Sequence, residues 1–224
     1  MTNIMKRYLY ALCFACLTVT GCYDPTEGTV SAGGAAPKQG TIEVSRNDRQ
    51  LALDAENTDM KWTGSNTVGQ TPYGFFYQLS GKAVVDGRSQ ELKSVEVLID
   101  MTSVQAMDKK LTKKLKENGF FEVTKYPAAS FESTSITKGP RKDDKDGTTH
   151  VIEGNFQLRD VTKSIQIPVA IEVDPDSFTL TSEFSINRTD YGVVYENSAE
   201  DALIRDGVVI NLEITIPPKE ESAE

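Results

Sequence analysis

Groups that commonly carry catalysis are scarce in this sequence of 224 residues. It contains one histidine, His150, and three cysteines, two of which fall within an apolar N-terminal stretch. It has no G-x-S-x-G motif and so no nucleophile elbow. The acidic run 142–147 (KDDKDG) lacks the alternating oxygen ligands and the distant glutamate of a calcium loop, and it reads as a charged hairpin turn. The sequence therefore predicts a protein that is not an enzyme and holds no metal or cofactor.

A long hydrophobic run is missing as well. The apolar stretch Tyr8–Val19 covers about twelve residues, which is too short to span a bilayer and typical of a signal-peptide core. Lys6 and Arg7 precede this stretch, and small residues lead from it to Cys22 (VTGC). The pattern resembles a bacterial lipoprotein signal, in which the cysteine is acylated and the preceding peptide is removed. An ordinary secretory signal with a cysteine nearby is the alternative.

On the lipoprotein interpretation, the mature chain would keep Cys22 as its single cysteine and attach it to lipid. It would then have no disulfide framework, and its stability would come from an apolar core. Removing residues 1–21 takes away Lys6 and Arg7 and no acidic residue, so the formal net charge changes from −9 to −11. An acidic surface of this kind argues against nucleic acid as a partner.

The same interpretation predicts where the protein is located. We expect an exported protein of the bacterial cell envelope, held to a membrane through the acylated Cys22. Tyr23 follows the cysteine where an aspartate would resemble an inner-membrane retention signal. The expected location is therefore the outer membrane, on the side that faces the periplasm.

Composition divides the chain into four parts. Residues 1–21 are the signal peptide, and residues 22–47, rich in Gly, Ala, Pro, Ser and Thr, are expected to form a flexible tether. Residues 48–217 are expected to form one folded domain, because no internal repeat or second boundary interrupts them. Residues 218–224 form a short charged tail.

Period-two alternation of apolar and polar residues dominates the domain and predicts half-buried strands. Turn signals such as Asp86-Gly87 and Asp174-Pro175-Asp176 separate the strands. A further short strand is expected near Leu51–Leu53. The alternating apolar sets fall within 60–64, 75–85, 95–101, 129–131, 152–158, 165–173, 178–186 and 208–216.

One segment breaks this rhythm. Val104, Met107, Leu111 and Leu115 recur at steps of three and four residues, lysines occupy the positions between them, and Asn118-Gly119 provides a stop. This predicts a single amphipathic helix in the middle of an all-β chain. We expect a closed antiparallel β-barrel of about eight strands with the helix capping one opening. A two-sheet sandwich is the alternative.

Three separated segments resemble the YceI-like family. They are Gly119–Phe131 (GFFEVTKYPAASF), Gly154–Lys163 (GNFQLRDVTK) and Phe184–Gly192 (FSINRTDYG). In the second segment, Asp160 stands where the family usually has glycine. The resemblance extends from about Asn57 to Ile216 and implies a lipocalin-like antiparallel barrel. Some members of the family hold a long polyisoprenoid or fatty-chain ligand in a tunnel that excludes water.

From the resemblance and the alternation together, we predict a binding protein that sequesters or carries such a lipid. Inward-facing apolar residues would line the barrel interior, although each of them could instead pack as ordinary core. The predicted lining consists of Met60, Trp62, Phe75, Tyr77, Leu79, Val97, Ile99, Leu111, Leu115, Phe120, Phe131, Phe156, Ile167, Val169, Phe184 and Ile186.

Several alternatives stay open at this point. A non-catalytic envelope scaffold with a packed barrel would show the same alternation. The lysine-rich helix could face an anionic group or simply be solvated. Arg188 and Asp190 could hold a ligand headgroup, or pair with each other and fix a corner of the chain. Small inward residues, including Gly64, Gly81 and Gly154, suggest free interior volume.

Overall fold

A computed structural model describes Val30 and residues 32–37, 43–141, 144–145, 147–195 and 198–218. The signal region, Cys22 and the charged tail beyond Pro218 lie outside the described residues. Within the described part of the chain, no helix is long and apolar enough to cross a membrane.

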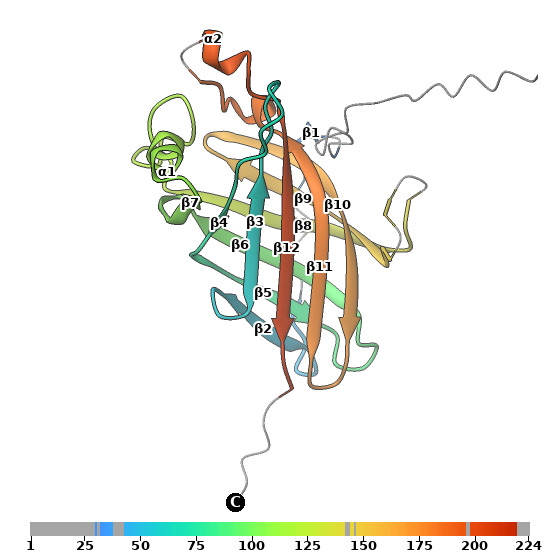
Figure 1. The fold of residues 1–224 in the computed structure, drawn as a ribbon. Helices are drawn as coiled ribbons and strands as arrows, with labels where there is room; N and C mark the ends of the chain where they lie inside the picture. Colours follow the sequence, from blue (N-terminus) through green and yellow to red (C-terminus); the bar gives the residue numbers. More distant parts are fainter. Residues whose placement is uncertain are drawn as a thin grey trace, which may run out of the picture.

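The described chain is mostly antiparallel β-structure, with two short α-helices (Figure 1). The helices are α1 (Lys109–Lys116) and α2 (Ser198–Asp201), and single 3₁₀ turns, η1 and η2, cover Met101–Ser103 and Arg188–Tyr191. The strands are β1 (Ala32–Gly34), β2 (Arg49–Asp54), β3 (Thr58–Thr63), β4 (Tyr73–Phe76), β5 (Leu79–Val85), β6 (Leu92–Asp100), β7 (Val104–Ala106), β8 (Ala128–Lys138), β9 (His150–Leu158), β10 (Val161–Val173), β11 (Phe178–Asn187) and β12 (Gly207–Ile216).

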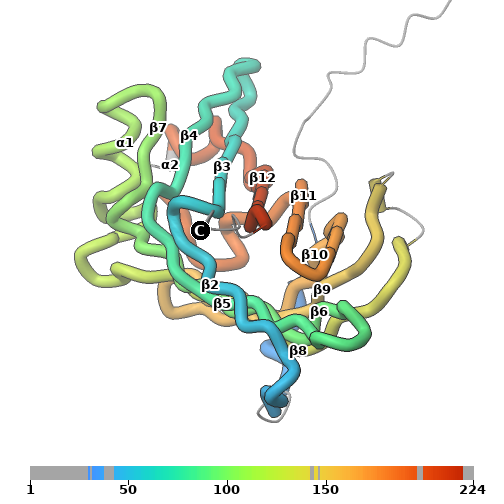
Figure 2. The backbone as a smooth tube through the Cα atoms, turned by 90° about the horizontal axis from the view of Figure 1, so that it is seen from below, coloured from blue at the N-terminus to red at the C-terminus, as the bar shows by residue number. Residues whose placement is uncertain are grey.

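These strands form one strongly curled sheet in the order β2-β5-β6-β8-β9-β10-β11-β12-β3-β4-β7, with β1 attached to β10. Only Tyr77 and Gln78 separate β4 from β5, so the chain itself links the two ends of this order. Figure 2 shows the result: β5, β6 and β8 cross one side of the molecule, and β11, β12 and β3 cross the other. The lipocalin-like all-β prediction is thereby confirmed.

The described residues form twelve strands, more than the predicted number of about eight. Two short strands, β1 and β7, contain three residues each, too few to show alternation. The predicted strand over 75–85 is bent at Tyr77 and Gln78 and divides into β4 and β5. The turn between β9 and β10 closes over two residues, with Arg159 at a φ of 57°, so glycine is not required at position 160.

The mid-chain helix is shorter than the periodicity predicts. Val104 belongs to β7, which pairs with β4, and α1 begins only after Asp108. The Asp108 carboxylate accepts a hydrogen bond from the Leu111 backbone N–H at 2.8 Å and caps the helix. Gly119, at a φ of 87°, follows the end of the helix, as the Asn-Gly stop predicts.

The pairing of β10 with β11 stops early. It covers only Ala170–Val173, because Pro168 lacks the N–H that would continue the ladder, and its carbonyl accepts a hydrogen bond from Ser182 Oγ instead. Further along the same edge of β10, Ala32–Gly34 adds as strand β1, and the Val30 N–H donates to the Ser185 carbonyl of β11. Within the range 22–47 that is predicted to be a flexible tether, the described residues around β1 thus span the interrupted seam.

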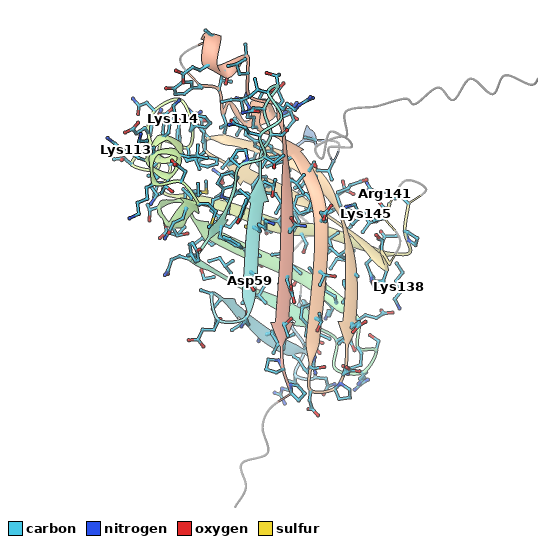
Figure 3. All side chains as sticks on the ribbon, viewed as in Figure 1. Asp59, Lys113, Lys114, Lys138, Arg141 and Lys145 are labelled. Carbon is cyan, nitrogen blue, oxygen red and sulfur yellow. The ribbon has the colours of Figure 1, made fainter. Side chains whose placement is uncertain are left out.

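The connection between β8 and β9 covers the same seam from outside. Arg141 Nη1 donates to Gln166 Oε1 of β10 at 2.7 Å, and Lys145 forms an ion pair with Glu183 of β11. Figure 3 shows Arg141 and Lys145 on this side of the molecule, away from Lys113 and Lys114 of α1.

Candidate ligand-binding cavity

The curled sheet encloses a cavity of about 900 Å³. Its wall is built from alternate residues of nearly every long strand, because the inner face of each strand presents every second side chain. Cross-strand partners therefore face the cavity together: Ile99 lies opposite Ala129, Phe131 opposite Phe156, and Phe184 opposite Ile210. The result is a continuous apolar surface.

Most of the predicted lining residues border this cavity. Those contributed by the strands face one another across it, and those from α1 and the turn after it close one end. The predicted residues found in the wall are Met60, Trp62, Val97, Ile99, Leu111, Leu115, Phe120, Phe131, Phe156, Ile167, Val169, Phe184 and Ile186.

Phe75, Tyr77 and Leu79 do not line the cavity, and their assignment to its wall is wrong. The prediction carried one inward phase from 75 to 85, but the chain changes phase at the bend after β4. Phe75 lies opposite Lys61 on the outer face, and Tyr77 is half exposed. Leu79 is buried opposite Ile99 and shares its face of the sheet, but it is not among the residues that border the cavity.

Phe76 and Phe121 are lining residues that the prediction missed. Phe76 lies opposite Met60 on the inner face, and its ring is 6.3 Å from that of Phe121. Pairing the alternation of residues 60–62 with that of residues 74–76 would have identified Phe76. Phe121 follows Phe120 in a tight turn, where periodicity carries no signal.

The small inward residues serve different purposes. A Cβ added at Gly81 would lie 2.2 Å from the Glu96 carbonyl oxygen, and one at Gly154 would lie 2.4 Å from the Phe131 ring. These two glycines allow close packing and leave no free space. Gly64 differs, because it lines the cavity and an added Cβ would meet no atom within 4 Å.

Polar residues gather where α1, α2 and the β3–β4 connection meet, and they mark the mouth of the cavity. Asp108 caps the start of α1, Lys114 lies within α1, and Glu200 comes from α2. Lys114 Nζ lies 2.5 Å from Glu200 and 4.2 Å from the centre of the Tyr195 ring. The hydrogen bond to Glu200 is the main cause that raises the pKa of Lys114, so this ammonium group stays charged and joins the two helices across the mouth.

Arg188 stabilises the chain segments at the same end of the cavity. Its side chain is buried, and its guanidinium contacts Asp201 at 2.7 Å, Asp206 at 3.1 Å and the Val193 carbonyl at 2.8 Å. Asp190 pairs with Lys163 at 3.2 Å, so Arg188 and Asp190 fix the chain with other partners rather than with each other. The bonds of Arg188 tie the segment that carries α2 to the end of β11.

Two polar atoms in the cavity wall have no hydrogen-bond partner among the described residues, Trp62 Nε1 and Ser65 Oγ. Both atoms have almost no accessible surface. A ligand in the cavity would not reach them without movement of the wall, so we assign them no contact.

The described residues show no arrangement that resembles a catalytic site. His150 lies on β9 outside the cavity wall, with Nδ1 2.8 Å from Thr149 Oγ1. Partial burial lowers the pKa of His150, and the nearby Lys138 adds to that effect. No group of three or more acidic, histidine or cysteine side chains in the described ranges could hold a metal ion.

A family model described as "YceI-like domain" matches residues 51–216. This match covers every long strand and the whole cavity. The chain belongs to the YceI family. The three segments that carry the resemblance in sequence form the exit from α1 with the start of β8, the β9–β10 hairpin, and the end of β11 with the turn that holds Arg188.

Among curated relatives, this YceI-family chain is 34% identical to "Protein YceI" of Shigella flexneri over 163 residues, covering 73% of this chain and 71% of that protein. It is 33% identical over 95 residues to a UPF0312 protein of Pectobacterium carotovorum, a match that covers 42% of this chain and 46% of that protein.

Two solved structures share the fold of this YceI-family chain. BcnA of Burkholderia cenocepacia aligns with a TM-score of 0.64 at 18% identity, covering 74% of this chain and 99% of that one. A domain of Saccharophagus degradans described as polyisoprenoid-binding aligns with a TM-score of 0.55 at 13% identity, covering 75% and 98%. At these identities the likeness concerns the fold alone.

Proposed function

We propose that this protein is a non-catalytic carrier that holds a polyisoprenoid or a similar long-chain lipid inside the curled sheet. The observation that carries the proposal is the apolar cavity of about 900 Å³. Its size lies within the range of small-molecule pockets, about 300–1,000 Å³. A scaffold with a packed interior would fill this space with side chains.

The physical basis of binding is burial of apolar surface. A hydrocarbon chain gains about 25 cal/mol for each Å² removed from water, and it needs only a continuous apolar wall. The aliphatic and aromatic residues of β3, β6 and β8–β12 provide that wall. The polyisoprenoid-binding description of the Saccharophagus domain, which shares the fold, supports the choice of lipid class.

Export and lipid anchoring through Cys22 form the second part of the proposal. They rest on the N-terminal pattern, in which Lys6 and Arg7 precede the apolar stretch Tyr8–Val19 and small residues lead from it to Cys22. An anchored carrier would keep its cavity close to a source of long-chain lipid. Outer-membrane placement follows from Tyr23 after the cysteine.

The test is identification of a bound lipid. The protein is purified from cells that export it, extracted with organic solvent, and the extract is analysed by mass spectrometry; polyprenyl probes are then titrated into the extracted protein. A stoichiometric long-chain lipid is expected. A protein that is reproducibly empty and takes up no probe would contradict the proposal.

Gly64 offers a matched pair of variants for this experiment. Gly64→Trp places a large ring in open space within the cavity and is expected to reduce probe uptake at least tenfold with little change in stability. Gly64→Ala adds one methyl group to the same space and is expected to bind as the unaltered protein does. Equal uptake by both variants would place the ligand elsewhere.

A further inference from the structure

The outer face of β4 and the bend after it carry aromatic side chains, two of which are exposed. Tyr73, Phe75 and Tyr77 form a row, with ring centres 6.5 Å apart between the first two and 5.8 Å between the last two. Tyr73 is 39% exposed and Tyr77 is 50% exposed. Met107, just before α1, is 69% exposed. Large apolar side chains gathered on a surface in this way mark an interaction site.

The first lysine of α1, Lys109, borders this aromatic row. Phe75, Tyr77, Met107 and Lys109 line one shallow hollow of about 320 Å³, together with Thr112. We call the set Tyr73, Phe75, Tyr77, Met107, Lys109 and Lys110 the aromatic–lysine face. Lys61 extends it on β3, with Nζ 4.9 Å from the centre of the Tyr73 ring.

The charge of this face is opposite to that of the whole chain. Helix α1 contains five lysines and no acidic residue, in a protein with a formal net charge of −9. Lys109 and Lys110 are exposed and form no ion pair with any described residue. Lys113, which Figure 3 shows with Lys114 on α1, pairs only at 3.7 Å with Glu117, and both side chains are largely exposed. Positive charge is therefore available to a partner.

We propose that the aromatic–lysine face docks the protein on the surface of an anionic lipid bilayer. Aromatic rings and a methionine side chain suit the boundary between headgroups and acyl chains, and exposed lysines suit the negative lipid phosphates. This inference goes beyond the holding of a lipid, because it concerns a surface outside the cavity.

Helix α1 connects this face to the mouth of the cavity. Leu111, Lys114 and Leu115 line the cavity at its mouth, while Lys109 borders the hollow beside the aromatic row and Lys110, next to it in α1, is exposed. A bilayer in contact with the aromatic–lysine face would thus lie next to the mouth. A soluble acidic protein could also bind the lysines. An acidic protein partner, however, would not explain why one helix contributes to both the cavity mouth and the aromatic–lysine face.

The experiment measures binding to vesicles by sedimentation. The protein is the chain from residue 22 onward with Cys22→Ser, which keeps every described residue and removes the acyl chain. Vesicles contain phosphatidylethanolamine and phosphatidylglycerol at a ratio of 7 to 3, and phosphatidylcholine vesicles serve as the neutral reference. Binding is expected to favour the anionic vesicles and to weaken as salt is raised, because salt screens exposed charges.

Charge-reversal variants show whether binding depends on the lysines of the aromatic–lysine face or only on the net charge of the protein. Each basic residue near an anionic surface contributes about fivefold to binding, so K109E/K110E is expected to weaken it at least twentyfold. The matched control is R46E/R88E, which makes the same change of charge at exposed positions around the β5–β6 turn. That turn is separated from α1 by the length of β6, nine residues or about 30 Å. The control is expected to change binding by less than threefold.

Tyr77→Ser tests the aromatic part against Val44→Ser, an exposed apolar residue close to Arg46 in the chain. Tyr77→Ser is expected to weaken binding several-fold, and Val44→Ser to leave it unchanged. Uptake of polyprenyl probe in solution is expected to be unaffected in all four variants, so failure of docking is distinguishable from failure of lipid holding. No binding to anionic vesicles, the result expected for an acidic protein partner, would overturn the proposal, and so would an equal loss in both charge-reversal variants.

Discussion

Phe156 shows how much one residue of the cavity wall contributes. Its ring packs edge-on against Tyr191, with centres 5.3 Å apart, and lies opposite Phe131 on β8. We expect Phe156→Asp to lower the free energy of unfolding by roughly 3 kcal/mol or more, because it places an unpaired charge in an apolar wall. Urea unfolding followed by fluorescence measures the change.

The neighbouring residue provides the control for Phe156. Gln157 is exposed on the outer face, and Gln157→Asp is expected to change the stability by less than about 0.5 kcal/mol. Phe184→Asp, opposite Ile210 on the other wall, is expected to behave like Phe156→Asp. Stable Phe156→Asp and Phe184→Asp proteins would show that these strand faces are assigned the wrong way round.

Arg188 is the second residue whose effect is predictable. Arg188→Met leaves Asp201 and Asp206 without their cation. We expect the free energy of unfolding to fall by about 3 kcal/mol. This is the lower end of the range for a broken buried ion pair, because Asp206 is half exposed. The measurement is urea unfolding at neutral pH. A loss below 1 kcal/mol would mean that the ion pairs of Arg188 with Asp201 and Asp206 contribute little to stability.

The effect of Arg188 should also depend on pH. Burial acts to raise the pKa of Asp201, but the hydrogen bonds from Arg188 and from the Tyr195 N–H outweigh it and lower the pKa below the ordinary 3.8. A lowered pKa in the folded state stabilises the protein above pH 3.8, and that contribution is lost as the pH falls through the folded value. The difference in the free energy of unfolding between the unaltered protein and Arg188→Met is therefore expected to be constant from about pH 7 to 5 and to shrink below about pH 4.

At the scale of elements, the contact between β4 and β7 depends on Gly74. A Cβ at this position would lie 1.8 Å from the Gln105 carbonyl oxygen, so Gly74→Ala forces the two strands apart. We expect a loss of roughly 3 kcal/mol, and faster hydrogen exchange in β7 and α1. Gly64→Ala, which meets no atom within 4 Å, is the control and should be close to neutral. Equal stability of the two variants would mean that β7 does not hold its place against β4.

The strands were predictable because most have one buried and one solvent-exposed face. Residues 152–158 and 178–186 show the resulting alternation of apolar and polar side chains without interruption. The prediction failed where elements are short or bent. Alternation in 75–85 gives no sign that the backbone turns at Tyr77, and three residues of β7 cannot be told from the first turn of a helix that starts with Val104. The contacts of Arg188 were also beyond sequence reasoning, because Asp201 and Asp206 reach it only after the chain turns back through α2.

At the scale of the whole molecule, we predict that membrane anchoring and folding are separable. Cys22 lies outside the described residues, and its acylation stays a prediction. We expect Cys22→Ser to release the protein from membranes or to leave the signal uncleaved while the domain still folds, because two or three acyl chains hold firmly and none would remain. Fractionation with palmitate labelling measures this. An unlabelled unaltered protein found wholly in the soluble fraction would mean that the signal is an ordinary secretory one.

The segment around β1 has a consequence for self-association. Pro168 leaves the edge of β10 without a continuous partner, and an open edge offers unpaired N–H and C=O groups to any other strand. Ala32–Gly34 occupies that edge at Lys163–Ile165. A chain shortened by proteolysis to begin after Pro37 would expose it, and two such chains could join β10 to β10 in an intermolecular sheet. We therefore expect the pairing of β1 with β10 to keep neighbouring copies of the chain from joining at this edge.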